Sequence, residues 1–421
     1  MQVSKLATNI IGSEIIKLAG EVNEKIKAGE KIYNLTIGDF NPNEFPIPEQ
    51  LKQFIIEEYT KNQTNYPPAD GMLELRKAVS NLLKQNGGLT YAPDEILIAG
   101  GARPIIYSIF RTLVDAGDKV VFATPSWNNN HYTYLNHAVP VVIEATSEQN
   151  FMPSAKDIQP HISDAALVAL CSPQNPTGTV YTKEGLEEIC DLILLENKQR
   201  GENQKPVYLM YDQIYWELTY GAIKHHDPVS LRPEMKKYTV FVDGISKSLA
   251  ATGVRVGWSM GPKFIIDKMK AILTHIGAWA PKAEQLATAR YLDNLEVYNQ
   301  FLIVQREKIH QRLQKLYEGF SQLKAEGFPV NVIAPQAAIY LTVQFSLCGH
   351  LTSDGRVIST VKEATKYLLD EAKLAIVPFY AFGLPETSDW YRVSVGTCKL
   401  EDVEAIIQSI RIALSGLKRM E

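Results

Sequence analysis

The chain has few residues of the kinds that mark metal-binding or membrane proteins. Its four cysteines and eight histidines are scattered over 421 residues, without the close spacing of metal ligands. Four separated thiols fit a reducing compartment better than a disulfide framework. No apolar run approaches the ~20 residues that a membrane helix needs. The sequence therefore predicts no metal site and no membrane span.

An excess of basic residues is also absent. The formal net charge is −4, from 43 Lys and Arg against 47 Asp and Glu, so we expect no nucleic-acid partner. Residues 1–20 mix charged and polar residues with apolar ones, which is unlike a signal peptide. We therefore expect a cytoplasmic protein. With 45% hydrophobic residues and 421 positions, the chain is expected to be globular and long enough for two domains.

The apolar pattern predicts an α/β fold. Strand and helix signals alternate from about residue 95 to 260, which favours a largely parallel sheet with helices on both faces. Helical periodicity then dominates residues 262–326. The final third has shorter strands over 339–345, 374–377 and 391–395, between helices near 355–371 and 400–417. That pattern predicts a smaller α+β unit, and a further helix is predicted over 13–27.

The most informative residue is Lys247, in the segment 244–258. It follows a turn of small residues, and Arg255 comes eight residues later. A lysine amine condenses with a carbonyl to form a Schiff base, and pyridoxal phosphate is its natural carbonyl partner. Arg255 is then a candidate for the phosphate, since guanidinium offers a fixed charge and several donors. The alternative for this segment alone is a surface lysine in a Ser/Gly loop.

Asp212 and Tyr215 follow a second strand-like run, residues 207–210. Open α/β sheets place ligand-binding groups at the carboxyl ends of their strands. A carboxylate there can pair with a protonated pyridine nitrogen and keep the ring an electron sink. Tyr215 is a candidate donor to the ring's phenolic oxygen. The alternative for Asp212 is a helix N-cap.

Three further strand ends carry candidate groups. Asn175 lies in segment 172–178, where two prolines and a glycine force a non-helical loop, although Asn-Pro is also common in plain turns. Gly101 lies between a predicted strand and the helix of residues 105–113, where backbone N–H groups favour an anion. A dinucleotide site is the rival there, but the third spaced glycine is missing. Trp127 can stack on a flat ring or serve as a core residue.

In this order, and each at the end of a predicted strand, these motifs resemble the class I/II aminotransferase family of fold-type I pyridoxal phosphate enzymes. Within this family the chain resembles the aspartate aminotransferases. The resemblance extends from about Asn34 to about Thr397. It implies a large domain with a mostly parallel sheet over residues 46–290. It also implies a small domain made of residues 1–45 and 291–421, and a homodimer that shares its active sites.

The resemblance also implies a role for each site residue. Lys247 would bind the cofactor and move the substrate's proton, with Asp212 and Tyr215 as its catalytic partners. The implied cofactor-binding set is Tyr66 (from the neighbouring subunit), Gly101, Ala102, Arg103, Trp127, Asn175, Asp212, Tyr215, Ser246, Lys247 and Arg255. The implied substrate-binding set is Gly38, Asn175 and Arg392, with Arg392 on the α-carboxylate because its fork suits a bidentate contact.

Some positions depart from the family pattern. Many relatives have a serine where this chain has Gly244, so one phosphate donor is expected to be absent. Arg103 replaces a lysine that lies near the substrate's distal carboxylate in some aspartate-specific relatives. The polar segment 128–132 is expected either to line the pocket or to start a helix.

The function implied by the resemblance is an amino-acid:2-oxo-acid aminotransferase that works by a ping-pong cycle. Aspartate is the favoured donor and 2-oxoglutarate the acceptor, with aromatic amino acids and alanine as other donors. The alternative is a pyridoxal phosphate lyase or synthase on the same fold, similar to aminocyclopropane-carboxylate synthase. A non-catalytic module of this fold and a dinucleotide-binding dehydrogenase are further rivals. Lys247, Asp212 and Arg392 oppose the first of these, and the incomplete glycine pattern opposes the second.

Overall fold

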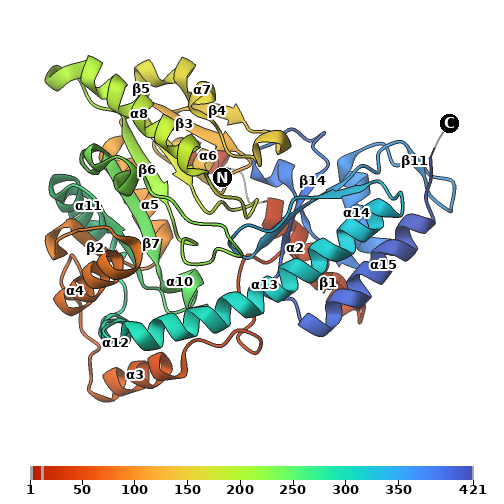
Figure 1. The fold of residues 1–421 in the computed structure, drawn as a ribbon, viewed down its shortest axis with the longest axis horizontal. Helices are drawn as coiled ribbons and strands as arrows, with labels where there is room; N and C mark the ends of the chain where they lie inside the picture. Colours follow the sequence, from red (N-terminus) through yellow and green to blue (C-terminus); the bar gives the residue numbers. More distant parts are fainter. Residues whose placement is uncertain (1–2, 11–13, 420–421) are drawn as a thin grey trace.

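The computed structural model describes residues 3–10 and 14–419, and its two main sheets have seven and four strands (Figure 1). The helices of these residues are Lys5–Asn9 (α1), Glu14–Lys27 (α2), Glu49–Thr60 (α3), Leu73–Leu82 (α4), Ala102–Leu113 (α5), Asn129–Leu135 (α6), Ala155–Ile158 (α7), Lys183–Arg200 (α8), Pro228–Leu231 (α9), Ile245–Ser248 (α10), Lys263–Ile276 (α11), Lys282–Leu292 (α12), Leu295–Ala325 (α13), Val361–Glu371 (α14) and Val403–Ser415 (α15). The strands are Tyr33–Asn34 (β1), Ile96–Ala99 (β2), Lys119–Thr124 (β3), Val139–Glu144 (β4), Ala165–Cys171 (β5), Tyr208–Asp212 (β6), Thr239–Gly244 (β7), Gly257–Met260 (β8), Val330–Val332 (β9), Tyr340–Phe345 (β10), His350–Leu351 (β11), Leu374–Ala375 (β12), Val377–Pro378 (β13), Trp390–Ser394 (β14) and Lys418–Arg419 (β15).

The larger sheet is mostly parallel. Its strand order is β2-β8-β7-β6-β5-β3-β4. The neighbours from β7 to β4 pair in parallel, whereas β8 runs antiparallel to both β2 and β7. The predicted α/β class is therefore confirmed. The parallel strands end at a common edge, and the polar residues predicted as a site follow those ends.

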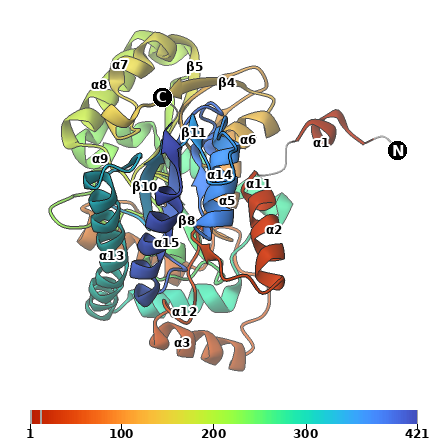
Figure 2. The ribbon, with the colours of Figure 1, turned by 90° about the vertical axis from the view of Figure 1, so that its right-hand side faces the viewer.

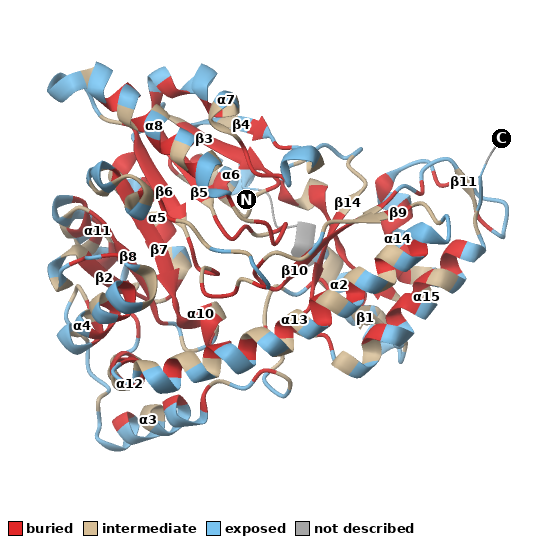
Figure 3. Ribbon diagram, in the orientation of Figure 1, coloured by how far each residue is buried: buried red, intermediate tan, exposed pale blue. Residues whose placement is uncertain are grey.

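Helices cover both faces of this sheet, which explains why its strands read as continuous apolar runs (Figure 3). In β3, Val120 and Phe122 belong to one buried cluster with residues of α5 and α11. Their neighbours Val121 and Ala123 belong to the opposite cluster, with residues of α4, α8 and α12. Every residue of β7 is buried. Both faces of the strands are thus desolvated, and the sheet is a rigid support for the loops at its edge.

The smaller sheet is antiparallel, in the order β13-β14-β10-β9. Buried apolar side chains of β9, β10 and β14 share one cluster with residues of α13, α14 and α15, whereas Val377 of β13 belongs to the cluster that includes residues of α4, α8 and α12. Helix α13 has 31 residues, about 46 Å at 1.5 Å per residue, and runs from the larger sheet to the smaller one (Figure 1). This part of the chain is the α+β unit that the sequence predicts.

The N-terminal part of the chain packs with the C-terminal third. Strand β1 pairs in parallel with β12, with Tyr33 opposite Leu374. Val22 of α2 is fully buried against Leu369 of α14 and Ala375 of β12, and Figure 2 shows α2 next to α14. Residues near the start of the chain and residues of its last third therefore share one packed region. The boundaries at 46–290 stay a prediction.

Three local details differ from the sequence-based expectation. The strand predicted over 374–377 is two strands, because β12 pairs with β1 whereas β13 pairs with β14. The helix predicted from about 355 begins at Val361, because Thr360 and Glu363 form a capping box there. Residues Lys418–Arg419 form β15, which pairs with β11 and lies outside the elements that the sequence predicts. Over the described residues, no helix has both the length and the apolar character needed to cross a membrane.

Candidate active site

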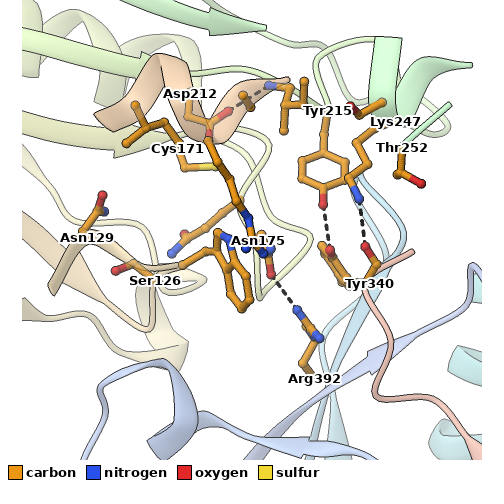
Figure 4. A pocket seen from close by; sticks show the side chains of 18 of the residues that line it. Ser126, Asn129, Cys171, Asn175, Asp212, Tyr215, Lys247, Thr252, Tyr340 and Arg392 are labelled. Carbon is orange, nitrogen blue, oxygen red and sulfur yellow. Dashed lines mark hydrogen bonds between the residues drawn. The ribbon is translucent and has the colours of Figure 1, made fainter. Parts of the chain in front are cut away.

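A cavity of about 660 Å³ lies between the carboxyl edge of the larger sheet and strands β10 and β14 of the smaller one (Figure 4). Most of the predicted site residues line this one cavity. They are Gly38, Ala102, Arg103, Trp127, Asn175, Asp212, Tyr215, Ser246, Lys247, Arg255 and Arg392. Gly101 and Tyr66 do not line it. The fold thus collects residues that are up to about 350 positions apart in the sequence.

Lys247 projects into the cavity from α10, the single turn that follows β7. Its Nζ donates a hydrogen bond to the carbonyl oxygen of Gly38 at 2.8 Å. Burial lowers the pKa of Lys247 to about 8; the carboxylate of Asp39 opposes this change, and the positive charge of Arg392 adds to it. An appreciable fraction of this amine is therefore neutral near pH 7–8, which is the form that acts as a nucleophile or a base.

The turn that carries Lys247 is packed closely against β8. A Cβ on Gly244 would lie 2.7 Å from the Cα of Gly257 and 2.9 Å from the oxygen of Val256. Any larger side chain would push the two strands apart. The glycine found where many relatives carry a serine therefore has a steric reason in this chain.

Asp212 is the last residue of β6. One carboxylate oxygen accepts a hydrogen bond from the backbone N–H of Ile214 at 3.1 Å. Burial raises the pKa of Asp212 to about 6, and the Ile214 N–H and the charge of Lys247 oppose this rise. A cation placed beside this carboxyl group would favour its ionised form.

Arg392 crosses the cavity from β14 and is 2% exposed. Its Nη1 donates to Oδ1 of Asn175 at 2.9 Å, and its Nη2 donates to the carbonyl oxygen of Thr36 at 2.6 Å (Figure 4). Its Nε is buried without a hydrogen-bond partner. Burial lowers the pKa of Arg392.

No carboxylate in the described part of the chain forms an ion pair with Arg392. Leaving a guanidinium buried with only neutral partners costs several kcal/mol, at the order of magnitude found for unpaired buried charges. A ligand carboxylate would remove that cost and match the planar donors of the guanidinium. The arrangement indicates an anionic group of the substrate at this end of the cavity.

A second positively charged region of the cavity lies at the start of α5. Arg255 donates from Nη1 to the oxygen of Thr252 and from Nη2 to the oxygen of Gly100, both at 2.6 Å. Gly101 has a φ of +94°, which favours glycine, and a Cβ there would approach Nη2 of Arg255 to 2.2 Å and displace the guanidinium. Because α5 also directs its first N–H groups and the positive end of its dipole here, this end of the cavity suits a phosphate.

The remaining predicted residues surround these ends. The guanidinium carbon of Arg103 lies 5.5 Å from the ring centre of Trp127. The polar segment 128–132 both lines the cavity and starts a helix, since Asn129 faces the cavity and is the first residue of α6. Tyr66 is 81% exposed and packs edge-on against Trp279 with ring centres 5.1 Å apart. Its predicted contact with a neighbouring subunit stays a prediction.

Sequence reasoning missed Tyr340, the first residue of β10. Its hydroxyl is 2.6 Å from the hydroxyl of Tyr215, and its ring lies 4.7 Å from the guanidinium carbon of Arg392. A Cβ on Gly38 would approach the Tyr340 hydroxyl to 2.8 Å. Tyr340 thus lies between a predicted cofactor residue and a predicted substrate residue. The sequence shows only a tyrosine in an apolar strand, so this position could not be recognised.

The loop that carries Gly38 is held by a second contact that the sequence did not indicate. The hydroxyl of Thr252 donates to Oδ1 of Asp39 at 2.6 Å. Both residues line the cavity. This hydrogen bond joins the N-terminal loop to the segment between Lys247 and Arg255, and so closes one side of the cavity.

Comparisons with known proteins agree with this geometry. The family model for aminotransferase class I and II matches residues 30–410. An aspartate aminotransferase of Bacillus sp. (strain YM-2) is 30% identical over 403 residues, which cover 94% of this chain and 95% of the relative. A solved aspartate aminotransferase from Rhizobium meliloti superposes with a TM-score of 0.90 at 26% identity, over 99% of this chain and 100% of the other. The Thermus thermophilus aspartate aminotransferase solved with maleate has a TM-score of 0.85 at 26% identity, over 98% of this chain and 100% of the other. The chain therefore belongs to the class I and II aminotransferase family.

Proposed function

We propose that this aminotransferase uses pyridoxal 5′-phosphate bound at Lys247 and transfers the amino group of aspartate to 2-oxoglutarate. The observation that carries the cofactor proposal is the order of groups in one cavity. An amine of lowered pKa, a buried carboxyl group and a phosphate-type end all face the same space. Aromatic amino acids and alanine are the other donors to be compared.

The residues present fit the cofactor at each of its functional groups. Arg255, Ser246 and the start of α5 suit its phosphate. The carboxyl group of Asp212 suits a protonated ring nitrogen, whose charge would hold Asp212 ionised. Tyr215 and Asn175 offer polar groups to the ring hydroxyl, and the indole of Trp127 offers a flat face. When bound, pyridoxal phosphate supplies an electron sink that stabilises negative charge developing at the substrate's Cα.

The chain's own residues have three tasks in this proposal. Arg392 binds the α-carboxylate and fixes the direction of the Cα–H bond. Holding that bond in a fixed direction lowers the barrier to proton transfer. Nζ of Lys247 removes the proton from the substrate's Cα and returns a proton to complete the transfer. The two half-reactions share the cavity, so the donor leaves as its 2-oxo acid before the acceptor enters.

Aspartate is favoured because the cavity has a further cation besides Arg392 and the phosphate-binding candidate Arg255. Arg103 lines the cavity, and within residues 3–10 and 14–419 it forms no ion pair with a carboxylate. A distal carboxylate could reach a positive charge there while the α-carboxylate binds Arg392. The presence of maleate, a dicarboxylate, in the Thermus thermophilus relative agrees with this arrangement.

We also propose the assembly that the family resemblance implies. Residues 46–290 would form the large domain, and residues 1–45 with 291–421 the small one; the pairing of β1 with β12 supports the second grouping. A homodimer would cover the exposed Tyr66 and complete both active sites. We place the protein in the cytoplasm, in line with its scattered thiols.

The visible spectrum of the purified protein, before and after addition of L-aspartate without any oxo acid, tests the proposal. We expect a yellow absorbance that fades, with oxaloacetate and pyridoxamine phosphate formed in amounts equal to the protein. Absorbance that persists with aspartate but fades with tyrosine or alanine would show that the amino donor is an aromatic amino acid or alanine. Turnover without pyridoxamine phosphate would indicate the lyase or synthase alternative. A colourless protein that takes up no pyridoxal phosphate would contradict the cofactor assignment.

Removing the Tyr340 hydroxyl is expected to lower the catalytic efficiency only modestly. Tyr340→Phe deletes the partner of the Tyr215 hydroxyl, a neutral buried hydrogen bond worth about 0.5–1.5 kcal/mol. We expect kcat/KM for the amino donor to fall roughly 3- to 10-fold with little change in Tm. Tyr220→Phe is the matched control, since its buried hydroxyl donates to the oxygen of Ala338 outside the cavity. Equal kinetic losses in both variants would argue against a role for Tyr340 in the site.

A further inference from the structure

A second buried carboxyl group lies directly behind the lysine turn. Asp243, at the end of β7, is 1% exposed and does not line the cavity. Its Oδ1 accepts a hydrogen bond from the N–H of Gly244 at 2.7 Å. Its Oδ2 accepts from the indole N–H groups of Trp216 at 3.0 Å and Trp258 at 3.2 Å. Nothing in the reaction described above uses this group.

The three donors belong to three segments that each carry a cavity residue. Trp216 follows Tyr215 directly, and Gly244 opens the turn that carries Lys247. Trp258 lies on β8, three residues after Arg255 and opposite Asp243 in the strand pairing. A single carboxylate thus joins the segments that position the amine, the ring-hydroxyl donor and the phosphate end.

The chemistry of the contacts matches a carboxylate and no other side chain of this size. All three partners are N–H donors, and both oxygens accept. Burial and the nearby carboxyl group of Glu217 raise the pKa of Asp243 well above its usual value, and the hydrogen bonds from Gly244, Trp258 and Trp216 oppose this rise. An asparagine would point an NH₂ group either at the two indoles or at Gly244. Each choice leaves a buried donor facing a donor, which costs about 1–3 kcal/mol.

Apart from this carboxylate, the start of the turn is held by its pairing with β8 and by the Ile245 N–H, which donates to the oxygen of Val256 at 3.3 Å. Gly244 has no side chain, and α10 has only four residues, so its internal hydrogen bonds are few. The position of Nζ then depends on what holds the start of the turn. A displacement of about 1 Å in a reacting group can cost about 100-fold in rate.

We propose that Asp243 is a positioning residue, which fixes Lys247 relative to Tyr215 by holding Gly244 and Trp216 on one carboxylate. The proposal rests on the role proposed for Lys247. Asp243 contacts neither the substrate nor the cofactor. Its removal should therefore change the step that Lys247 performs and leave substrate capture by Arg392 almost unaltered.

Asp243→Asn in the cofactor-loaded protein tests this proposal. We expect kcat to fall about tenfold or more, and KM for the amino donor to change less than about twofold. We also expect the midpoint of the pH titration of the bound cofactor's absorbance to move by about half a pH unit or more, because that titration reports the surroundings of Nζ. Both values unchanged in a folded variant would overturn the proposal.

Asp227→Asn is the matched control. Asp227 is also buried, at 6% exposed, and its Oδ1 accepts from the N–H groups of Val229 and Ser230 at the start of α9. Asparagine caps a helix about as well as aspartate, so kcat and the titration should stay at wild-type values. An equal fall in kcat in this control would mean that any buried Asp→Asn change disturbs the site, and would overturn the assignment.

Two milder variants keep the proposal testable if Asp243→Asn does not fold. Trp216→Phe and Trp258→Phe each remove one of the N–H donors and keep the carboxylate. Trp216→Phe should lower kcat more than Trp258→Phe, because Trp216 follows Tyr215. Wild-type kcat and titration in both would overturn the proposal. A wild-type protein that binds no pyridoxal phosphate would instead be a failure of the proposed cofactor, so the two outcomes are distinguishable.

Discussion

Lys247→Ala is expected to lower kcat/KM for transamination by about 10⁴-fold while the protein keeps its fold. General base catalysis alone contributes about 10²–10⁴-fold, and this lysine also makes the proposed covalent bond to the cofactor. The fold should survive because the side chain projects into the cavity, and its one hydrogen bond goes to Gly38. Coupled assay of oxaloacetate formation measures the first effect, and thermal unfolding measures the second.

Two controls separate this effect from a general loss of charge. Lys247→Arg keeps the positive charge, but a guanidinium stays protonated and cannot accept the substrate's proton. This variant should therefore be as inactive as the alanine variant. Lys183→Ala removes an exposed lysine at the start of α8, where the amine lies 3.9 Å from Glu187, and should keep full activity. If Lys247→Ala retains a tenth of the wild-type rate, another group moves the proton and the mechanism is wrong.

Arg392→Ala is expected to lower kcat/KM for the amino donor by about 10²–10³-fold, mainly through a higher KM. Truncating one partner of a buried, hydrogen-bonded charge pair costs about 2–5 kcal/mol. The substrate's α-carboxylate would lose both Nη donors at once. Arg392→Lys should recover only part of the loss, because an ammonium group keeps the charge but not the planar fork.

A substrate without the α-carboxylate makes the Arg392 prediction specific. The wild-type protein should strongly prefer an amino acid over the corresponding decarboxylated amine, and the Arg392→Ala variant should lose most of that preference. Arg411→Ala is a suitable control, because this guanidinium pairs with Glu326 on the surface, away from the cavity. Unchanged KM in Arg392→Ala would mean that a different group binds the α-carboxylate.

Most of the residues predicted for the site line one cavity, and those at the ends of strands were the easiest to place from the sequence. Asp212 ends β6, whereas Asn175 and Lys247 come shortly after β5 and β7. The carboxyl ends of parallel strands share one edge whatever the details of packing. Apolar runs without alternation were enough to identify those strands. The predicted residues could therefore be brought together without knowledge of any side-chain contact.

The parts that were missed depend on contacts between the two sheets. Tyr215 meets Tyr340 from 125 positions away, and Arg392 meets the oxygen of Thr36 from 356 positions away. Such contacts depend on how β10 and β14 of the smaller sheet lie relative to the larger sheet. That arrangement leaves no local pattern in the sequence. Asp243 was missed for a similar reason, since a carboxylate at a strand end does not reveal that two distant indoles donate to it.

The pairing of β1 with β12 has a consequence for how the chain is made. Roughly 340 residues separate the two strands, and a ribosome adds about 5–20 residues per second. The N-terminal segment must therefore wait about 20–70 s before its partner strand emerges. During that time Leu35 and Val22, both buried in the finished molecule, have no native partners from β12 or α14 to cover them. These apolar side chains of the first-made segment are thus open to aggregation and to chaperone capture until the C-terminal third is made.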